Sequence, residues 1–173
     1  MVEDEEAAMV REMVAKAAIT EALYRYCRSM DRMDRDLALG CWHEGATVDY
    51  VDIFQGTGSG FVEWVWTAHQ PMLRHSHQIT NILVEVTGDR ACSEAYVTAV
   101  LWAGPESRPV EIVTRGRYLD AWSRRDGRWA IDRRIYLTDL MSTTPLPDTA
   151  LAAVSAPSHR DTDDPSYALF SGR

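Results

Sequence analysis

Residues 110–138, VEIVTRGRYLDAWSRRDGRWAIDRRIYLT, decide the fold class of this chain. Both halves are rich in β-branched and aromatic residues, a composition that favours strands. Between them lies Asp126-Gly127, a dipeptide typical of a two-residue hairpin turn. The stretch therefore predicts a long antiparallel hairpin with strands at 110–124 and 128–138.

The segments before this hairpin predict helices first and further strands later. Apolar residues at spacings of two to four predict a helix over 5–34. A second helix is expected from Asp36 through Trp42 to a stop at Gly45. The remaining expected elements are a strand at 47–54, a loop at 55–60, a helix at 61–69 with Ser59 as its N-cap, and strands at 76–87 and 90–103. This order is typical of an α+β fold and not of alternating βαβ units.

Length and composition limit the classes to which the protein can belong. The 173 residues are 46% hydrophobic and 25% charged, which suits one globular domain. We expect that domain over residues 1–144. A tail rich in proline, serine, threonine and aspartate follows at 145–173, and we expect it to be irregular. The net charge of −8 argues against nucleic acid as a partner, because an acidic surface repels phosphate backbones.

Three further features of the chain concern its location in the cell. No apolar run approaches the roughly 18 residues of a membrane-spanning helix. The acidic start, Met1-Val-Glu-Asp-Glu-Glu, is unlike a secretory signal. The cysteines Cys27, Cys41 and Cys92 are odd in number and have no metal-ligand spacing, so we expect free thiols. Together these features predict a cytoplasmic protein that does not bind membranes.

Two histidines and one aspartate are candidates for chemistry. His75 and His77 would share one face of a strand, because side chains alternate with period two. Two histidines can ligate zinc, but no third ligand is evident nearby, so no metal site is expected. His77 begins an expected strand and Asp31 lies near the end of the first helix. Taken singly, each is equally compatible with a structural role.

Several motifs, in their order along the chain, resemble one family. These are AITEALYRYCRSMDRMD at 18–34, HQITN at 77–81 and WSRRDGRWAI at 122–131. They resemble the SnoaL-like group of the NTF2/ketosteroid-isomerase-like superfamily. The resemblance implies a cone, in which N-terminal helices pack on a strongly curved antiparallel sheet around a pocket. It also implies a homo-oligomer, a trimer first and a dimer second. The tail lies outside the matched motifs, and we expect it to cover the pocket or an interface.

The resemblance is nearest to the dehydratase and dehydrochlorinase lyases of that superfamily. These enzymes pair a histidine base with an aspartate of the first helix, and the two positions fall on His77 and Asp31. Tyr26 matches a tyrosine position of one such dehydratase, whereas the acid of its next strand falls at Ala99. A carboxylate bonded to one imidazole nitrogen fixes the tautomer and supports the protonated ring.

The implied activity is that of a cofactor-independent and metal-independent lyase. Its substrate would be a small, largely apolar, ring-containing or aromatic molecule, as in the breakdown of aromatic compounds. His77 would remove a proton, with loss of water, halide or a small carbon fragment. The expected substrate-binding residues are Tyr26, Trp42, Tyr50, Trp66, Asn81, Arg117 and Tyr118. Two alternatives stay open: an isomerase or cyclase, and a non-catalytic binding or assembly subunit in which Asp31 and His77 need not touch.

Overall fold

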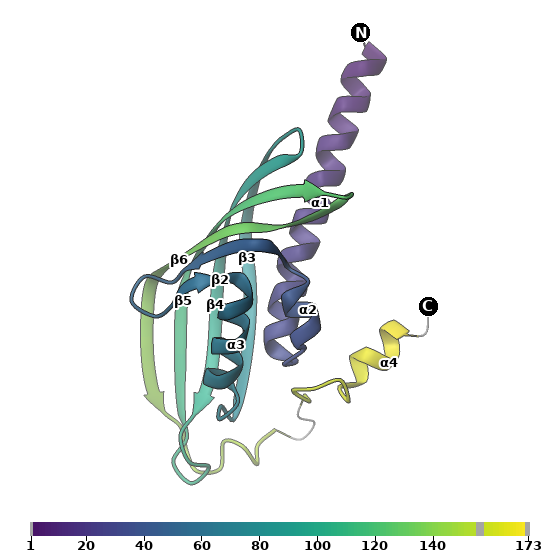
Figure 1. The fold of residues 1–173 in the computed structure, drawn as a ribbon. Coiled ribbons are helices and arrows are strands. Elements are labelled where there is room, and N and C mark those ends of the chain that lie inside the picture. The colour runs from purple at the N-terminus through teal and green to yellow at the C-terminus, as the bar shows by residue number, and fades with distance from the viewer. Residues whose placement is uncertain (1, 155–157, 172–173) are drawn as a thin grey trace.

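A computed structural model describes residues 2–154 and 158–171 of the chain. Its helices are α1 (Val2–Asp31), α2 (Arg35–Leu39), α3 (Gly58–His69) and α4 (Pro165–Ser171). Its strands are β1 (Trp42–Asp49), β2 (Gln55–Thr57), β3 (Arg74–Thr87), β4 (Arg90–Ala103), β5 (Val110–Arg125) and β6 (Arg128–Pro145). The strands form one sheet in the order β2-β1-β6-β5-β4-β3 (Figure 1).

The β5–β6 hairpin, which the sequence predicts, forms the centre of this sheet. Asp126 and Gly127 have φ angles of 51° and 79°, the left-handed values that a two-residue turn of this kind needs. β3, β4, β5 and β6 pair antiparallel in chain order. β1 departs from the expected antiparallel pattern, because it pairs parallel to β6, with Val48 opposite Arg134. The sheet is therefore mixed.

The sheet curves around the helices, which confirms the cone-shaped α+β fold (Figure 1). Gly116 lies at a register shift between β5 and β6, where an added Cβ would come within 2.2 Å of the Leu137 carbonyl oxygen. Only glycine allows the two strands to approach so closely. α1 and α3 bury their apolar faces against the concave side. This core includes Ile19, Leu23, Phe61, Val62, Trp122 and Ile131.

The region between α1 and α3 differs from the sequence prediction. The second helix ends at Leu39 with Gly40 as its cap, and Trp42 begins β1 instead of extending the helix. From Trp42 onward the buried positions suit a strand that pairs with β6, and this tertiary pairing overrides the helical spacing. β1 ends at Asp49, a turn follows, and α3 starts with Thr57 as its N-cap, not Ser59.

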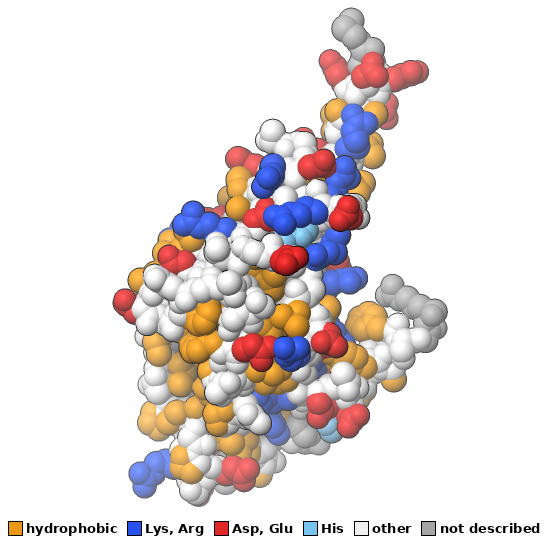
Figure 2. All heavy atoms as spheres, in the orientation of Figure 1, with side chains coloured by type: hydrophobic (Ala, Val, Ile, Leu, Met, Phe, Trp, Pro, Cys, Tyr) orange, Lys and Arg blue, Asp and Glu red, His pale blue; other side chains and the backbone are white. Residues whose placement is uncertain are grey.

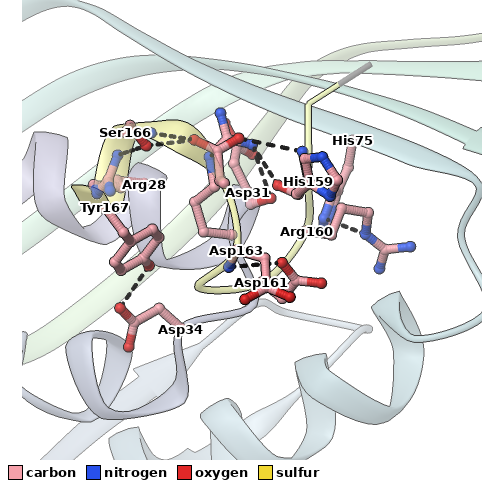
Figure 3. A network of polar contacts seen from close by, with 12 residues as sticks. Arg28, Asp31, Asp34, His75, His159, Arg160, Asp161, Asp163, Ser166 and Tyr167 are labelled. Atoms are coloured by element: carbon pink, nitrogen blue, oxygen red, sulfur yellow. Dashed lines mark hydrogen bonds and ion pairs between the residues drawn. The ribbon is translucent and has the colours of Figure 1, made fainter. Parts of the chain in front are cut away.

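The C-terminal segment is more ordered than expected. β6 continues to Pro145, and residues 165–171 form α4. The Tyr167 hydroxyl donates to Asp34 at 2.6 Å, and the Arg28 guanidinium lies 4.5 Å from the centre of the Tyr167 ring. These contacts dock the tail on the C-terminal part of α1 (Figure 3). Residues 155–157 and 172–173 of the tail lie outside the described residues.

The described helices include none that is both long and apolar enough to cross a membrane.

Candidate active site

Asp31 and His77 meet where the end of α1 reaches β3. The His77 Nδ1 lies 2.7 Å from Asp31 Oδ1, and the His77 backbone N–H donates to both carboxylate oxygens at 3.0 Å. β3 is an edge strand, so this backbone N–H points away from the sheet and is free to bind the carboxylate. The His77 side chain is 7% exposed and the Asp31 side chain 17%. The fold therefore brings together the pair that the resemblance implied.

The geometry of this pair fixes the state of the imidazole. An ionised carboxylate only accepts hydrogen bonds, so His77 Nδ1 carries the hydrogen that it donates to Asp31. The lone pair of the neutral ring is then on Nε2. A histidine held this way can accept a proton at Nε2, while the carboxylate stabilises the resulting cation. This is the arrangement of a general base.

His77 lines a cavity of about 280 Å³ inside the cone. The apolar part of its wall includes Met30, Phe61, Val65, Val97, Leu101 and Ile112. Three other lining residues, Ile53, Trp64 and Met141, are exposed on the surface, so the cavity opens to solvent there. Hydrophobic side chains gather over α3 and the neighbouring strands, whereas charged ones gather along the outer part of α1 (Figure 2). The cavity suits a small, largely apolar ligand.

The polar groups in the cavity include three tyrosine hydroxyls, beside two histidines and two threonines. Tyr50, Tyr118 and Tyr136 line it, and the hydroxyls of Tyr50 and Tyr26 are 3.2 Å apart. Tyr26 lies directly behind Tyr50. Burial raises the pKa of Tyr26, Tyr50 and Tyr118, so all three stay protonated at neutral pH. They can therefore act as neutral hydrogen-bond donors.

A buried ion pair supports these tyrosines from behind. Arg134 binds Asp120 through two hydrogen bonds of 2.7 Å, and both side chains are fully buried. The guanidinium lies 4.2 Å from the ring centre of Tyr26 and 3.9 Å from that of Tyr118. Strand alternation in β6 points Arg134 inward.

Of the seven expected substrate-binding residues, Tyr50 and Tyr118 line the cavity and Tyr26 lies behind Tyr50. The other four lie elsewhere. Trp42 is buried in the core, with its ring centre 6.0 Å from that of Tyr26, and Trp66 is half-buried against the same core. In α3 it is Trp64 that faces the cavity. Asn81 is exposed, with φ of 48° at an irregularity of β3.

Arg117 lies on the outer face of the sheet, where it pairs with Glu94 and Asp139. It precedes Tyr118, and neighbouring strand residues point to opposite faces, so only one of the two can face the cavity.

One polar residue of the cavity is not among those expected from the sequence. His69, the last residue of α3, lines the cavity, and its Nδ1 lies 3.2 Å from His75 Nδ1. The sequence does contain an indication of this position, because the short turn from α3 to β3 brings residues 69 and 75 close together. The described residues contain no group of three or more histidine, cysteine, aspartate or glutamate side chains placed to hold a metal ion.

The fold is that of a cone-shaped NTF2-like protein with an internal cavity. The family model for the SnoaL-like domain matches residues 11–135, and the chain belongs to this family. A search of curated proteins found no match.

Solved structures show the same fold. A provisionally assigned scytalone dehydratase from Novosphingobium aromaticivorans is 23% identical, with a TM-score of 0.68 over 75% of this chain and 87% of that one. A hexachlorocyclohexane dehydrochlorinase from Novosphingobium barchaimii is 19% identical, with a TM-score of 0.67 over 78% and 91%. A provisionally assigned aromatic ring hydroxylase from Novosphingobium aromaticivorans is 26% identical, with a TM-score of 0.66 over 75% and 92%. The structural neighbours thus include lyases.

Proposed function

We propose that the protein is a cofactor-independent lyase that acts on a small, largely apolar, ring-containing molecule. The observation that carries the proposal is the Asp31–His77 hydrogen bond of 2.7 Å at the wall of an apolar cavity. A binding subunit has no need of an oriented imidazole with a free Nε2 in its ligand cavity. The names of the dehydratase and dehydrochlorinase neighbours support the same class.

The elimination uses residues that line the cavity or lie directly behind it. His77 Nε2 takes a proton from a carbon of the substrate, and Asp31 stabilises the imidazolium that forms. The C–H electrons end in the new C=C bond, and the leaving group departs from the adjacent carbon with its own bonding pair. Where the leaving group is an oxygen, Tyr50 donates the proton that it needs, and Tyr26 hydrogen-bonds to Tyr50. A halide leaves without a proton.

The elimination can be tested with a general probe, because base strength and an apolar pocket are its only demands. The probe is 5-nitrobenzisoxazole, a small aromatic compound that opens to a coloured phenolate when a base removes its ring proton. The wild-type protein should accelerate this reaction. His77→Gln should lower the rate by about 100-fold or more, as expected for loss of a general base. His159→Gln, a substitution in the exposed tail, serves as the control and should leave it unchanged.

A wild-type rate no faster than buffer, or a folded His77→Gln variant that keeps the wild-type rate, would refute the lyase proposal.

The proposal extends to a cytoplasmic homotrimer that takes part in the breakdown of aromatic compounds, with a dimer as the second choice. The oligomer is supported by the outer face of the sheet. This face carries the charged Arg117 and exposes Leu83, Tyr96 and Leu140. Exposed apolar residues on one face are typical of surfaces that associate. Light scattering on the purified protein measures the mass of the assembly. A monomer over the whole concentration range would contradict this part of the proposal.

A further inference from the structure

Three histidines gather at one end of the cavity. His69 ends α3, and His75 and His77 lie near the start of β3. The rings of His69 and His77 are stacked, with centres 5.8 Å apart and planes at 25°. His69 and His77 both line the cavity, whereas His75 is buried beside them. Of these three histidines, only His77 takes part in the proposed elimination.

An arginine of the tail sets the protonation state of His75. Arg160 Nε donates to His75 Nε2 at 2.9 Å (Figure 3). The same guanidinium donates to the backbone carbonyls of His69 and Met72, so it is held from three sides. A guanidinium only donates hydrogen bonds. His75 Nε2 must therefore accept, and the hydrogen of a neutral His75 is on Nδ1.

The hydrogen on His75 then determines the tautomer of His69. His75 Nδ1 lies 3.2 Å from His69 Nδ1, and it is the donor of that pair. His69 Nδ1 accepts, so the ring hydrogen of His69 is on Nε2. No described residue forms a hydrogen bond with His69 Nε2. The two stacked rings thus differ in kind: His77 offers a lone pair at Nε2 and His69 offers an N–H at Nε2.

The surroundings keep both accessory histidines neutral. Burial lowers the pKa of His69 to about 4, helped by the charges of His77 and Arg160. Burial lowers the pKa of His75 to about 2, and the positive charge of Arg160 is the next largest cause. A cationic His69 would need a hydrogen on Nδ1, where His75 already donates. The hydrogen-bond chain and the burial act in the same direction.

We propose that His69 is a second catalytic residue, an Nε2–H donor that binds the carbonyl oxygen of a substrate whose α-carbon is deprotonated by His77. His75 and Arg160 are positioning residues that hold His69 in this tautomer. The inference rests on the proposed role of His77 as the base. It narrows the substrate class to carbonyl compounds with an α-hydrogen and a leaving group on the β-carbon.

The elimination then has two steps, formation of an enolate and loss of the β-substituent. His77 Nε2 takes the α-proton, and the C–H electrons form an enolate whose oxygen is bound by His69 Nε2–H. A neutral imidazole is a suitable donor to such an oxygen, because it stabilises the developing charge without giving up its own proton. The enolate electrons then form the C=C bond and expel the β-substituent.

The tautomers can be measured without a substrate. Long-range proton–nitrogen NMR spectra of the folded wild-type protein distinguish Nδ1–H from Nε2–H histidines. We expect the Nε2–H form for His69 and the Nδ1–H form for His75 and His77. Arg160→Met removes the donor to His75 and should leave both His75 and His69 as mixtures, whereas the surface control Arg90→Met should change neither. An Nδ1–H form of His69 in the wild-type protein overturns the proposal.

The donor role is tested with two ligands of nearly equal shape. Acetophenone carries a carbonyl oxygen, and α-methylstyrene replaces that oxygen with a methylene group. We expect His69→Phe to weaken acetophenone binding by about tenfold, the value of one hydrogen bond, and to leave α-methylstyrene binding within about twofold. Equal changes for both ligands, or no change for either, overturn the donor role. Neither experiment depends on turnover, so they separate this proposal from failure of His77 as the base.

Discussion

Asp31 holds His77 twice, through the imidazole Nδ1 at 2.7 Å and through the backbone N–H at 3.0 Å. The first contact sets the tautomer and the second sets the position of the strand that carries the ring. A helix end and a sheet edge are thereby joined by one carboxylate at the cavity wall. The pair is therefore both a structural link and the base of the proposed elimination.

Asp31→Asn should separate these two roles. The asparagine oxygen can still accept the backbone N–H of His77, but its amide group donates to Nδ1 and turns Nε2 into the protonated nitrogen. We expect the rate with 5-nitrobenzisoxazole to fall by about 100-fold, with a loss of only about 1–3 kcal/mol in unfolding free energy. Denaturant titration and initial rates measure the two effects. A wild-type rate in this variant would mean that the carboxylate is not needed for catalysis.

Tyr50→Phe tests the proton donor for an oxygen leaving group. The substitution keeps the ring in the cavity wall and removes only the hydroxyl that meets Tyr26. We expect turnover of a substrate that loses water to fall by about 10–100-fold, whereas a substrate that loses halide is affected little. Tyr96→Phe, on the outer face, is the matched control. Equal losses for both leaving groups would remove Tyr50 from the role of donor.

Stability should fall in mild acid because of His69 and His75. Their pKa values are lowered to about 4 and about 2 in the folded protein, against about 6.5 when unfolded. Below about pH 6.5 the unfolded chain therefore binds protons that the folded one does not, and unfolding free energy decreases by up to about 1.4 kcal/mol per pH unit for each histidine. Above that pH neither histidine contributes a slope.

The contribution of one histidine is isolated by comparison with a variant. His75→Gln should show a shallower decrease of unfolding free energy than the wild-type protein between about pH 6.5 and 4. Denaturant unfolding at a series of pH values measures both slopes. Identical slopes would show that His75 titrates equally in the folded and unfolded states.

Arg134→Met should be strongly destabilising. It leaves Asp120 buried without its two hydrogen bonds, a loss that typically costs about 3–5 kcal/mol. Adding Asp120→Leu removes the orphaned charge and should recover part of that loss. Thermal and denaturant unfolding of the single and double variants measure the recovery. A double variant less stable than Arg134→Met alone would show that the ion pair is not what the core requires.

Much of the fold is predictable because it depends on local signals. Asp126-Gly127 sets its turn without help from distant residues, and the β5–β6 hairpin follows. Local spacing predicts a helix at Trp42, whereas its strand conformation depends on pairing with β6, which is far away in the sequence. The tail was expected to be irregular, since nothing near Tyr167 reveals that Asp34 will accept its hydroxyl.

The site was predictable to a different degree. The order of the motifs points to Asp31 and His77. Arg117 and Tyr118 are neighbours in one strand, so strand alternation allows only one of them to face the cavity. Arg160 could not have been found, because its contact with His75 spans 85 positions and depends on where the tail docks.

A double-mutant cycle on Asp31 and His77 tests the central claim most directly. Initial rates with 5-nitrobenzisoxazole are compared for the wild-type protein, Asp31→Asn, His77→Gln and the double variant. If Asp31 acts through His77, the double variant has the same rate as His77→Gln alone, because residues that act as a unit are not additive. If the two losses multiply instead, Asp31 and His77 act independently, and the base pair proposed for this cavity is wrong.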